Sequence, residues 1–83
     1  MHADRQPPEI LVDRLILAQE LAGFSDRRMA AELGVSASLW TKTRRREVPV
    51  GITILRAAGR RYPELAVDVL ASLLTEQEAH GSA

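Results

Sequence analysis

The chain has no cysteine, which excludes disulfide bonds and thiolate metal sites and favours a reducing compartment, the cytoplasm. Its only aromatic residues are Phe24, Trp40 and Tyr62, too few for the core of a β-sandwich or β-barrel. No apolar run approaches the ~18 residues of a membrane span, and the N-terminus has no signal-peptide character, so we expect no membrane partner. Glycine (5) and proline (4) are few among 83 residues that are 46% hydrophobic. The composition predicts one small all-α bundle, too short for a second core or a separate ligand-sensing domain.

The positive charge is concentrated in the middle of the chain, although the formal net charge of the whole is zero. Residues 27–61 contain nine basic and two acidic side chains, whereas residues 1–26 and 62–83 are net acidic. Ten of the eleven basic residues are arginine, whose planar guanidinium suits phosphate oxygens and base edges better than lysine does. A local basic patch of this kind is the electrostatic footprint of a nucleic-acid partner.

Helical spacing of apolar residues, together with helix-capping residues, predicts five helices. They cover residues 9–22, 26–33, 37–47, 50–61 and 63–74. We expect them to form one domain over residues 9–75, with a flexible arm at 1–8 and a flexible polar tail at 76–83. In the first helix the stripe expected to face the core contains Leu17 and Leu21, flanked by Leu11 and Leu15. The side chains expected in the core of the other helices include Trp40 of the third, Ile52 of the fourth and Leu70 of the fifth.

Residues 25–46 have the organisation of a helix-turn-helix. Ser25 and Ser36 are suited to cap two short helices, and Gly34 permits the positive φ of the turn between them. Ala30 is small at the place where the two helices would cross closely. Trp40 lies where it should face the core and hold the second helix against the first.

This segment resembles the Cro and phage-repressor (XRE-like) helix-turn-helix family, and particularly its small phage and prophage members. Residues that match the family pattern, with Met29 in a Leu place and Trp40 in an Ile place, are Ser25, Met29, Ala30, Leu33, Gly34, Val35, Ser36, Trp40, Thr41 and Pro49. The resemblance covers about residues 10–75 and implies a lambda-repressor-like DNA-binding domain. The implied function is a sequence-specific double-stranded DNA-binding transcriptional regulator, a repressor that binds a palindromic operator as a homodimer.

Several positions depart from the family pattern. Asp26 and Ala37 stand where the family often has Gln, and Arg46 stands where it has Gly. Gln19 and Arg44 occupy the places of an Arg–Glu pair that some members form. Asp26 is expected to repel phosphate unless it caps a helix or pairs with a cation.

The resemblance implies a recognition helix that starts near Ala37 and enters the major groove. The positions that would face base edges are Ala37, Ser38, Thr41 and Lys42, with Lys42 as the candidate for a guanine contact. The positions that would contact phosphates are Ser36, Arg45 and Arg46, with Arg27 or Arg28 across the groove.

Other interpretations stay open at this point. The arginines at 44–46 could be a solvated helix end, where positive charge favours the helix dipole. Leu39 could pack on the fourth helix or face the groove. The same fold could also be a protein-binding module, such as a phage inhibitor of a host transcription or replication factor, or an antitoxin. Asp26 and Ala37 favour this alternative, in which the acidic last helix and tail would face the protein partner.

The sequence contains no Gly-rich phosphate loop, nucleophile elbow or metal-spaced ligand set, so we expect no enzyme activity, no cofactor and no metal. The family resemblance implies a homodimer, and some apolar residues exceed what one small core needs. The expected dimer surface consists of Val67, Val69, Leu73 and Leu74 in the last helix and a small stripe of Val12 and Ile16 in the first.

Overall fold

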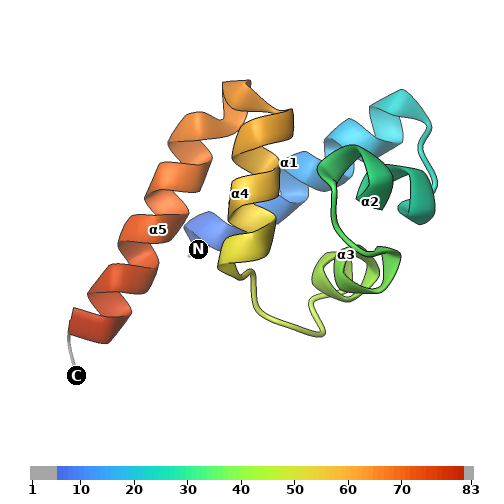
Figure 1. The fold of residues 1–83 in the computed structure, drawn as a ribbon. Helices are drawn as coiled ribbons and strands as arrows, with labels where there is room; N and C mark the ends of the chain where they lie inside the picture. The colour runs from blue at the N-terminus through green and yellow to red at the C-terminus, as the bar shows by residue number, and fades with distance from the viewer. Residues whose placement is uncertain (1–5, 82–83) are drawn as a thin grey trace, which may run out of the picture.

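Five α-helices and one short 3-10 helix make up the chain between Pro7 and Gly81 (Figure 1). The structure, a computed structural model, describes residues 6–81 and the side chains of residues 6–75. The elements are α1 (Pro7–Ala22), α2 (Asp26–Leu33), α3 (Ala37–Arg44), α4 (Ile52–Arg61), the 3-10 helix η1 (Pro63–Leu65) and α5 (Ala66–Gly81). The predicted all-α fold with five helices is confirmed for this part of the chain.

Both ends of the helical domain differ from the sequence prediction. α1 begins at Pro7 because two prolines occupy its first positions and the Gln6 N–H donates to Oε1 of Glu9 at 3.1 Å. Residues 7 and 8 of the expected arm at 1–8 therefore belong to α1. Residues 1–5 lie outside the described residues. α5 continues to Gly81, so a helix end at Leu74 was wrong. Its polar end is rich in good helix formers, and polarity alone does not stop a helix.

The core lies where α1 and α4 meet the pair α2 and α3 (Figure 1). In that view α1 passes behind α4, α5 packs along both of them, and α2 and α3 pack on each other at the far end. Trp40 is fully buried, as predicted. The largest buried side chains around it are Leu11, Leu15, Met29, Leu33, Ile54 and Leu55.

The predicted core stripe of α1 was wrong in its central residues and right in its flanking residues Leu11 and Leu15. Leu17 and Leu21 are 52% and 80% exposed, whereas Leu11, Leu15 and Val12 are buried. α1 packs against α5 and also contacts α3, so its buried face is centred between its two apolar stripes. A helix with apolar residues on two sides does not reveal which side its neighbours will cover.

The predicted burial in α4 and α5 needs the same kind of correction. Ile52 and Leu70 are 49% and 58% exposed. Ile54, which the prediction did not include, is buried in the core. α4 packs against α2 on one side and α5 on the other, so two of its faces are covered. Val69 and Leu73 attach α5 to the core and leave Leu70 on the outer side.

The first three helices end in the same way, although only two of them end in glycine. Gly23 and Gly34 have φ values of 72° and 78°, and Arg46 has a φ of 61°. At the end of α3 the N–H of Glu47 donates to the carbonyl of Lys42 at 2.9 Å, and the N–H of Arg46 donates to that of Thr43 at 3.0 Å. This is the Schellman arrangement, which requires a left-handed residue. Arg46 thus has the left-handed backbone conformation that glycine adopts most readily.

The left-handed backbone at position 46 predicts an unusual order of stability. We expect Arg46→Gly to be more stable than Arg46→Ala by about 1 kcal/mol, because only glycine adopts this conformation without a Cβ penalty. Both changes remove the same side chain, so the comparison isolates the backbone. Urea denaturation of the two variants measures the difference, and equal stability, or a more stable alanine variant, would contradict it.

Candidate nucleic-acid interface

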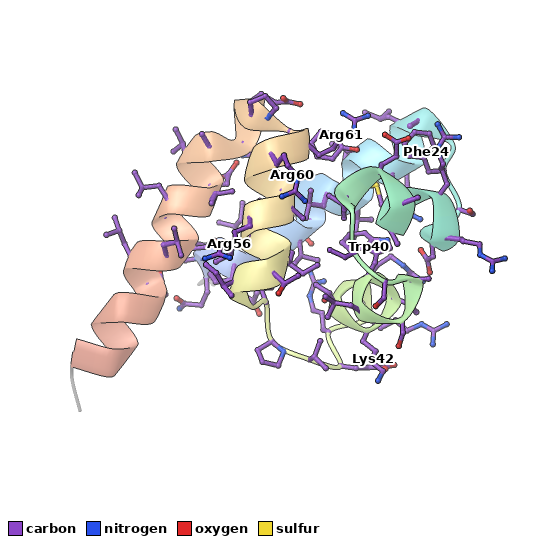
Figure 2. All side chains as sticks on the ribbon, viewed as in Figure 1. Phe24, Trp40, Lys42, Arg56, Arg60 and Arg61 are labelled. Carbon is purple, nitrogen blue, oxygen red and sulfur yellow. The ribbon has the colours of Figure 1, made fainter. Side chains whose placement is uncertain are left out.

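α3 has an inner face that is buried and an outer face that is open to solvent. On the inner face Trp40 and Thr43 are 0% and 1% exposed. On the outer face Ala37, Ser38, Lys42 and Arg45 are exposed. Figure 2 shows Lys42 on the side of α3 away from the other helices and Trp40 on the side that faces the body of the protein. The structure thus brings together on one surface most of the residues that the sequence predicted for base contacts.

The start of α3 is held by Ser36. Its Oγ accepts a hydrogen bond from the N–H of Leu39 at 3.1 Å, and Ser25 caps α2 in the same way through the N–H of Arg28. The Ser36 hydroxyl is therefore committed to its own helix. The N–H groups of Ala37 and Ser38 precede that of Trp40, the first to bond back to a carbonyl of this helix, so they stay available to an anion.

A buried hydrogen bond links the inner face of α3 to α1. The indole N–H of Trp40 donates to Oε1 of Gln19 at 3.0 Å. The amide nitrogen of Gln19 donates to Oδ1 of Asp26 at 2.8 Å and to the carbonyl of Phe24 at 3.2 Å. The Trp40 N–H would otherwise be an unpaired polar group in the core, so Gln19 is what permits a tryptophan at this position.

Asp26 is the point where the three helices meet. Arg44 donates from Nε to Oδ1 of Asp26 at 2.9 Å and from Nη2 to Oδ2 at 2.6 Å. Thr41 Oγ1 also donates to Oδ2, at 3.2 Å. The carboxylate that was expected to repel phosphate is therefore paired with a cation. Gln19 and Arg44 are joined through it.

These partners change the acidity of the carboxyl group. The pKa of Asp26 is lowered from 3.8 to about 2, mainly by the hydrogen bond from Arg44 and then by that from Gln19, against the opposing effect of partial burial. The same pair raises the pKa of Arg44. Asp26 is therefore a fixed negative charge at neutral pH, and Arg44 is not a solvated helix end.

Most of the other arginines also have partners. Arg28 binds Glu32 at 2.9 Å and lies 4.7 Å from the ring centre of Phe24. Glu32 also binds Arg61 at 2.9 Å, and these two hydrogen-bonded guanidiniums lower its pKa. Arg46 binds Asp13 at 2.6 Å. These pairs neutralise much of the positive charge that the sequence places in the middle of the chain.

Arg60 has a structural task that the sequence did not reveal. Its Nη2 donates to the carbonyl of Leu33 at 3.1 Å, so it binds the last turn of α2. A Cβ placed on Gly34 would lie 3.2 Å from the same nitrogen. Arg60 therefore needs both the exposed carbonyl and the small residue that ends α2.

Four basic side chains within residues 27–61 have no ion pair or hydrogen bond to another described residue: Arg27, Lys42, Arg45 and Arg56. Figure 2 shows Lys42 on α3 and Arg56 on the side of α4 nearer α5. Arg45 directly follows α3. The unpaired charge near α3 is thus smaller than the sequence count suggests, and it is concentrated on the outer face of α3 and the start of α2.

The predicted interface residues fall into two groups. Ala37, Ser38, Lys42, Arg27 and Arg45 are exposed and unengaged among the described side chains. The others, Arg28, Ser36, Thr41 and Arg46, are engaged with neighbours. Leu39, whose position was open, is half-buried and packs against the core.

Comparisons with family models, curated proteins and solved structures found no match for this chain. Within residues 6–81, none of the helices has the length and apolar character needed to cross a membrane.

The lowered pKa of Asp26 predicts a loss of stability in acid. A carboxyl group whose pKa is lower in the folded than in the unfolded chain stabilises the fold above the unfolded value, and this contribution disappears as the pH falls through the folded value. We expect Asp26 to contribute about 1 kcal/mol that is lost between pH 4 and pH 2, a value reduced for its partial exposure.

The Asp26→Asn variant provides the comparison, because acid also titrates the other carboxylates in both proteins. The free energy of unfolding of the parent should fall more steeply over this interval than that of the variant. Titration of the Asp26 carboxyl carbon by NMR should have a midpoint near 2. A midpoint near 4, with parallel stability curves, would show that the Arg44 contact is not formed in solution.

Proposed function

We propose that this protein is a sequence-specific double-stranded DNA-binding transcriptional regulator of the XRE-like kind, and that it represses by occluding a promoter. The observation that supports this best is the contrast between the two faces of α3. Its inner face is held by Trp40 and Arg44, while its outer face presents Ser38, Lys42 and Arg45 to solvent. A rigid helix with a small polar and basic outer face suits the major groove of DNA.

In this proposal the exposed side chains divide into two roles. Lys42 reads guanine, and Ala37 and Ser38 contact the edges of neighbouring base pairs. Arg27, Arg45 and the free N–H groups at the start of α3 bind phosphates. Arg46 and Arg28 leave their exposed carboxylate partners and bind phosphate instead. Exposed ion pairs contribute little to stability, so breaking these two costs little free energy.

The protein-binding alternative loses one of its two supports. Asp26 favoured that alternative because it stands where the family often has Gln and would repel phosphate, but Arg44 and Thr41 bind it. Ala37 is the support that stays. We therefore favour DNA as the partner of the outer face of α3, inside a bacterial or phage-infected cell.

We place the homodimer contact on α5, with a correction to the expected residues. Val12 is buried, and Ile16, Val69 and Leu73 pack against the core, so none of these four is free to meet a second copy. The exposed apolar side chains of α5 are Val67, Leu70 and Leu74, at 78%, 58% and 53% exposure. Their spacing of three and four residues puts them on one stripe of the helix, as an isologous helix–helix contact requires.

Selection of bound sequences from a random DNA pool at roughly physiological salt tests the proposal directly. We expect an enriched palindrome, and loss of enrichment at one position of each half-site in Lys42→Ala. Arg45→Ala should weaken binding to all sequences and lower the salt dependence by about one counterion.

Arg56→Ala is the matched control, since Arg56 is an equally unpaired arginine on another side of the protein (Figure 2). It should bind the selected DNA with the affinity and salt dependence of the parent. Failure to enrich any sequence, or equal effects of the Arg45 and Arg56 changes, would contradict the assignment of this face to DNA.

The dimer contact has its own prediction. Leu70→Glu should give a monomer with unchanged helix content, because it places a charge in the apolar stripe without touching the core. Leu21→Glu is the control, since Leu21 is an exposed apolar residue of α1. Sedimentation equilibrium measures both, and a dimer that survives Leu70→Glu would remove α5 from the proposal.

A further inference from the structure

An open pocket of about 510 Å³ lies away from the outer face of α3. It is bordered by the first turns of α1, the end of α3, the loop that leads to α4, and the inner side of α5. In Figure 1 this loop runs along the lower edge of the molecule from α3 to α4. The volume falls in the range of about 300–1,000 Å³ that is typical of small-molecule sites.

Thr43 is one of the residues that line this pocket, and its hydroxyl oxygen is buried without a partner among the described residues. The residue is only 1% exposed. A buried helical hydroxyl ordinarily donates to the carbonyl four residues earlier. Ser72 and Thr75, which line the same pocket from α5, do this to Asp68 and Ala71, each at 2.9 Å. Thr43 is the exception, and an unpaired buried hydroxyl is a group that a bound molecule can satisfy.

The walls of the pocket are mainly apolar. They include Val12, Val48, Val50 and Leu55, of which Val12 and Leu55 also belong to the buried interior. Pockets that combine apolar walls with one placed polar group favour molecules of matching character. The occupant should therefore be mainly apolar and carry a single hydrogen-bonding group.

The charges at the rim disfavour an anion. Glu9 and Glu47 line the pocket together with one cation, Arg46. That cation is already paired with Asp13 at 2.6 Å. The two glutamates therefore leave the rim with an excess of negative charge, which repels an anionic ligand.

We infer that this pocket binds a small, uncharged, mainly apolar molecule, and that Thr43 rotates about χ1 so that its hydroxyl meets the hydrogen-bonding group of that molecule. The inference goes beyond the proposed function and does not depend on it. Among the lining residues Arg46 also has a role in that function, but the contact with Thr43 does not involve it. It would make the protein a receptor for a small molecule within the same domain.

The test uses N-phenyl-1-naphthylamine, an uncharged fluorescent probe with an apolar body and one N–H group. We expect saturable binding to the full chain, with a rise in fluorescence. Thr43→Val keeps the shape of the side chain and removes the hydroxyl, so it should weaken binding about fivefold. The 8-sulfonate of the same probe, which adds only an anionic group, should bind at least tenfold more weakly.

Two further variants locate the site. Val48→Phe should fill the pocket and abolish binding, whereas Leu21→Phe adds the same ring to an exposed position of α1 outside the pocket and should bind as the parent does. Circular dichroism checks that each variant is folded. If Val48→Phe does not fold, the comparison of Thr43→Val with the parent still tests the site.

Three results would overturn the inference. They are absence of saturable binding to the full chain, equal binding by the parent, Thr43→Val and Val48→Phe, and binding of the sulfonate as tight as that of the uncharged probe. Because no DNA is present, failure here leaves the DNA-binding proposal untouched. Failure of the DNA selection likewise does not affect this measurement.

Discussion

The arrangement of the first three helices depends on one carboxylate. Asp26 at the start of α2 receives hydrogen bonds from Gln19 of α1 and from Thr41 and Arg44 of α3, and Gln19 holds the indole of Trp40. Ion pairs that are partly withdrawn from water are poor sources of net stability. Their value here is geometric, because a two-point guanidinium contact fixes the rotation of α3 about its own axis. That rotation decides which residues of α3 meet the core and which meet a partner.

The fold was more predictable from the sequence than the packing was. Capping serines and turn glycines place the boundaries between the first three helices by local chemistry, which a sequence carries directly. Pro63 was less informative, because it begins a 3-10 helix and α5 starts only at Ala66. The burial of Leu17 and Leu21 depends on which neighbours cover α1, and that is a property of the whole chain. α1 has apolar residues on two sides, so its periodicity admits both answers. Trp40 was predictable because α3 has few apolar residues, so its one large aromatic side chain marks the face that must be buried.

The candidate site was predictable in outline, but the pairing of its charges was not. The sequence correctly predicted that Lys42 of α3 and Arg45, the residue after α3, are exposed. It could not show that Asp26, Glu32 and Asp13 each bind a distant or neighbouring arginine, because these partners are up to 33 residues apart. Asp26 was the one sequence signal of this pairing, because an acid at a position where phosphate is expected must either repel the phosphate or have a cation nearby. Thr43 gave no signal at all, since an unpaired hydroxyl is recognised only in three dimensions.

Position 46 shows how two selective pressures can oppose each other at one residue. The backbone there is left-handed and favours glycine, while the surface around it benefits from a long cation that can reach Asp13 or a phosphate. No single amino acid satisfies both. Sequences that diverge from this one should therefore alternate at this position between glycine and arginine or lysine, with asparagine as an intermediate that tolerates the backbone without the charge.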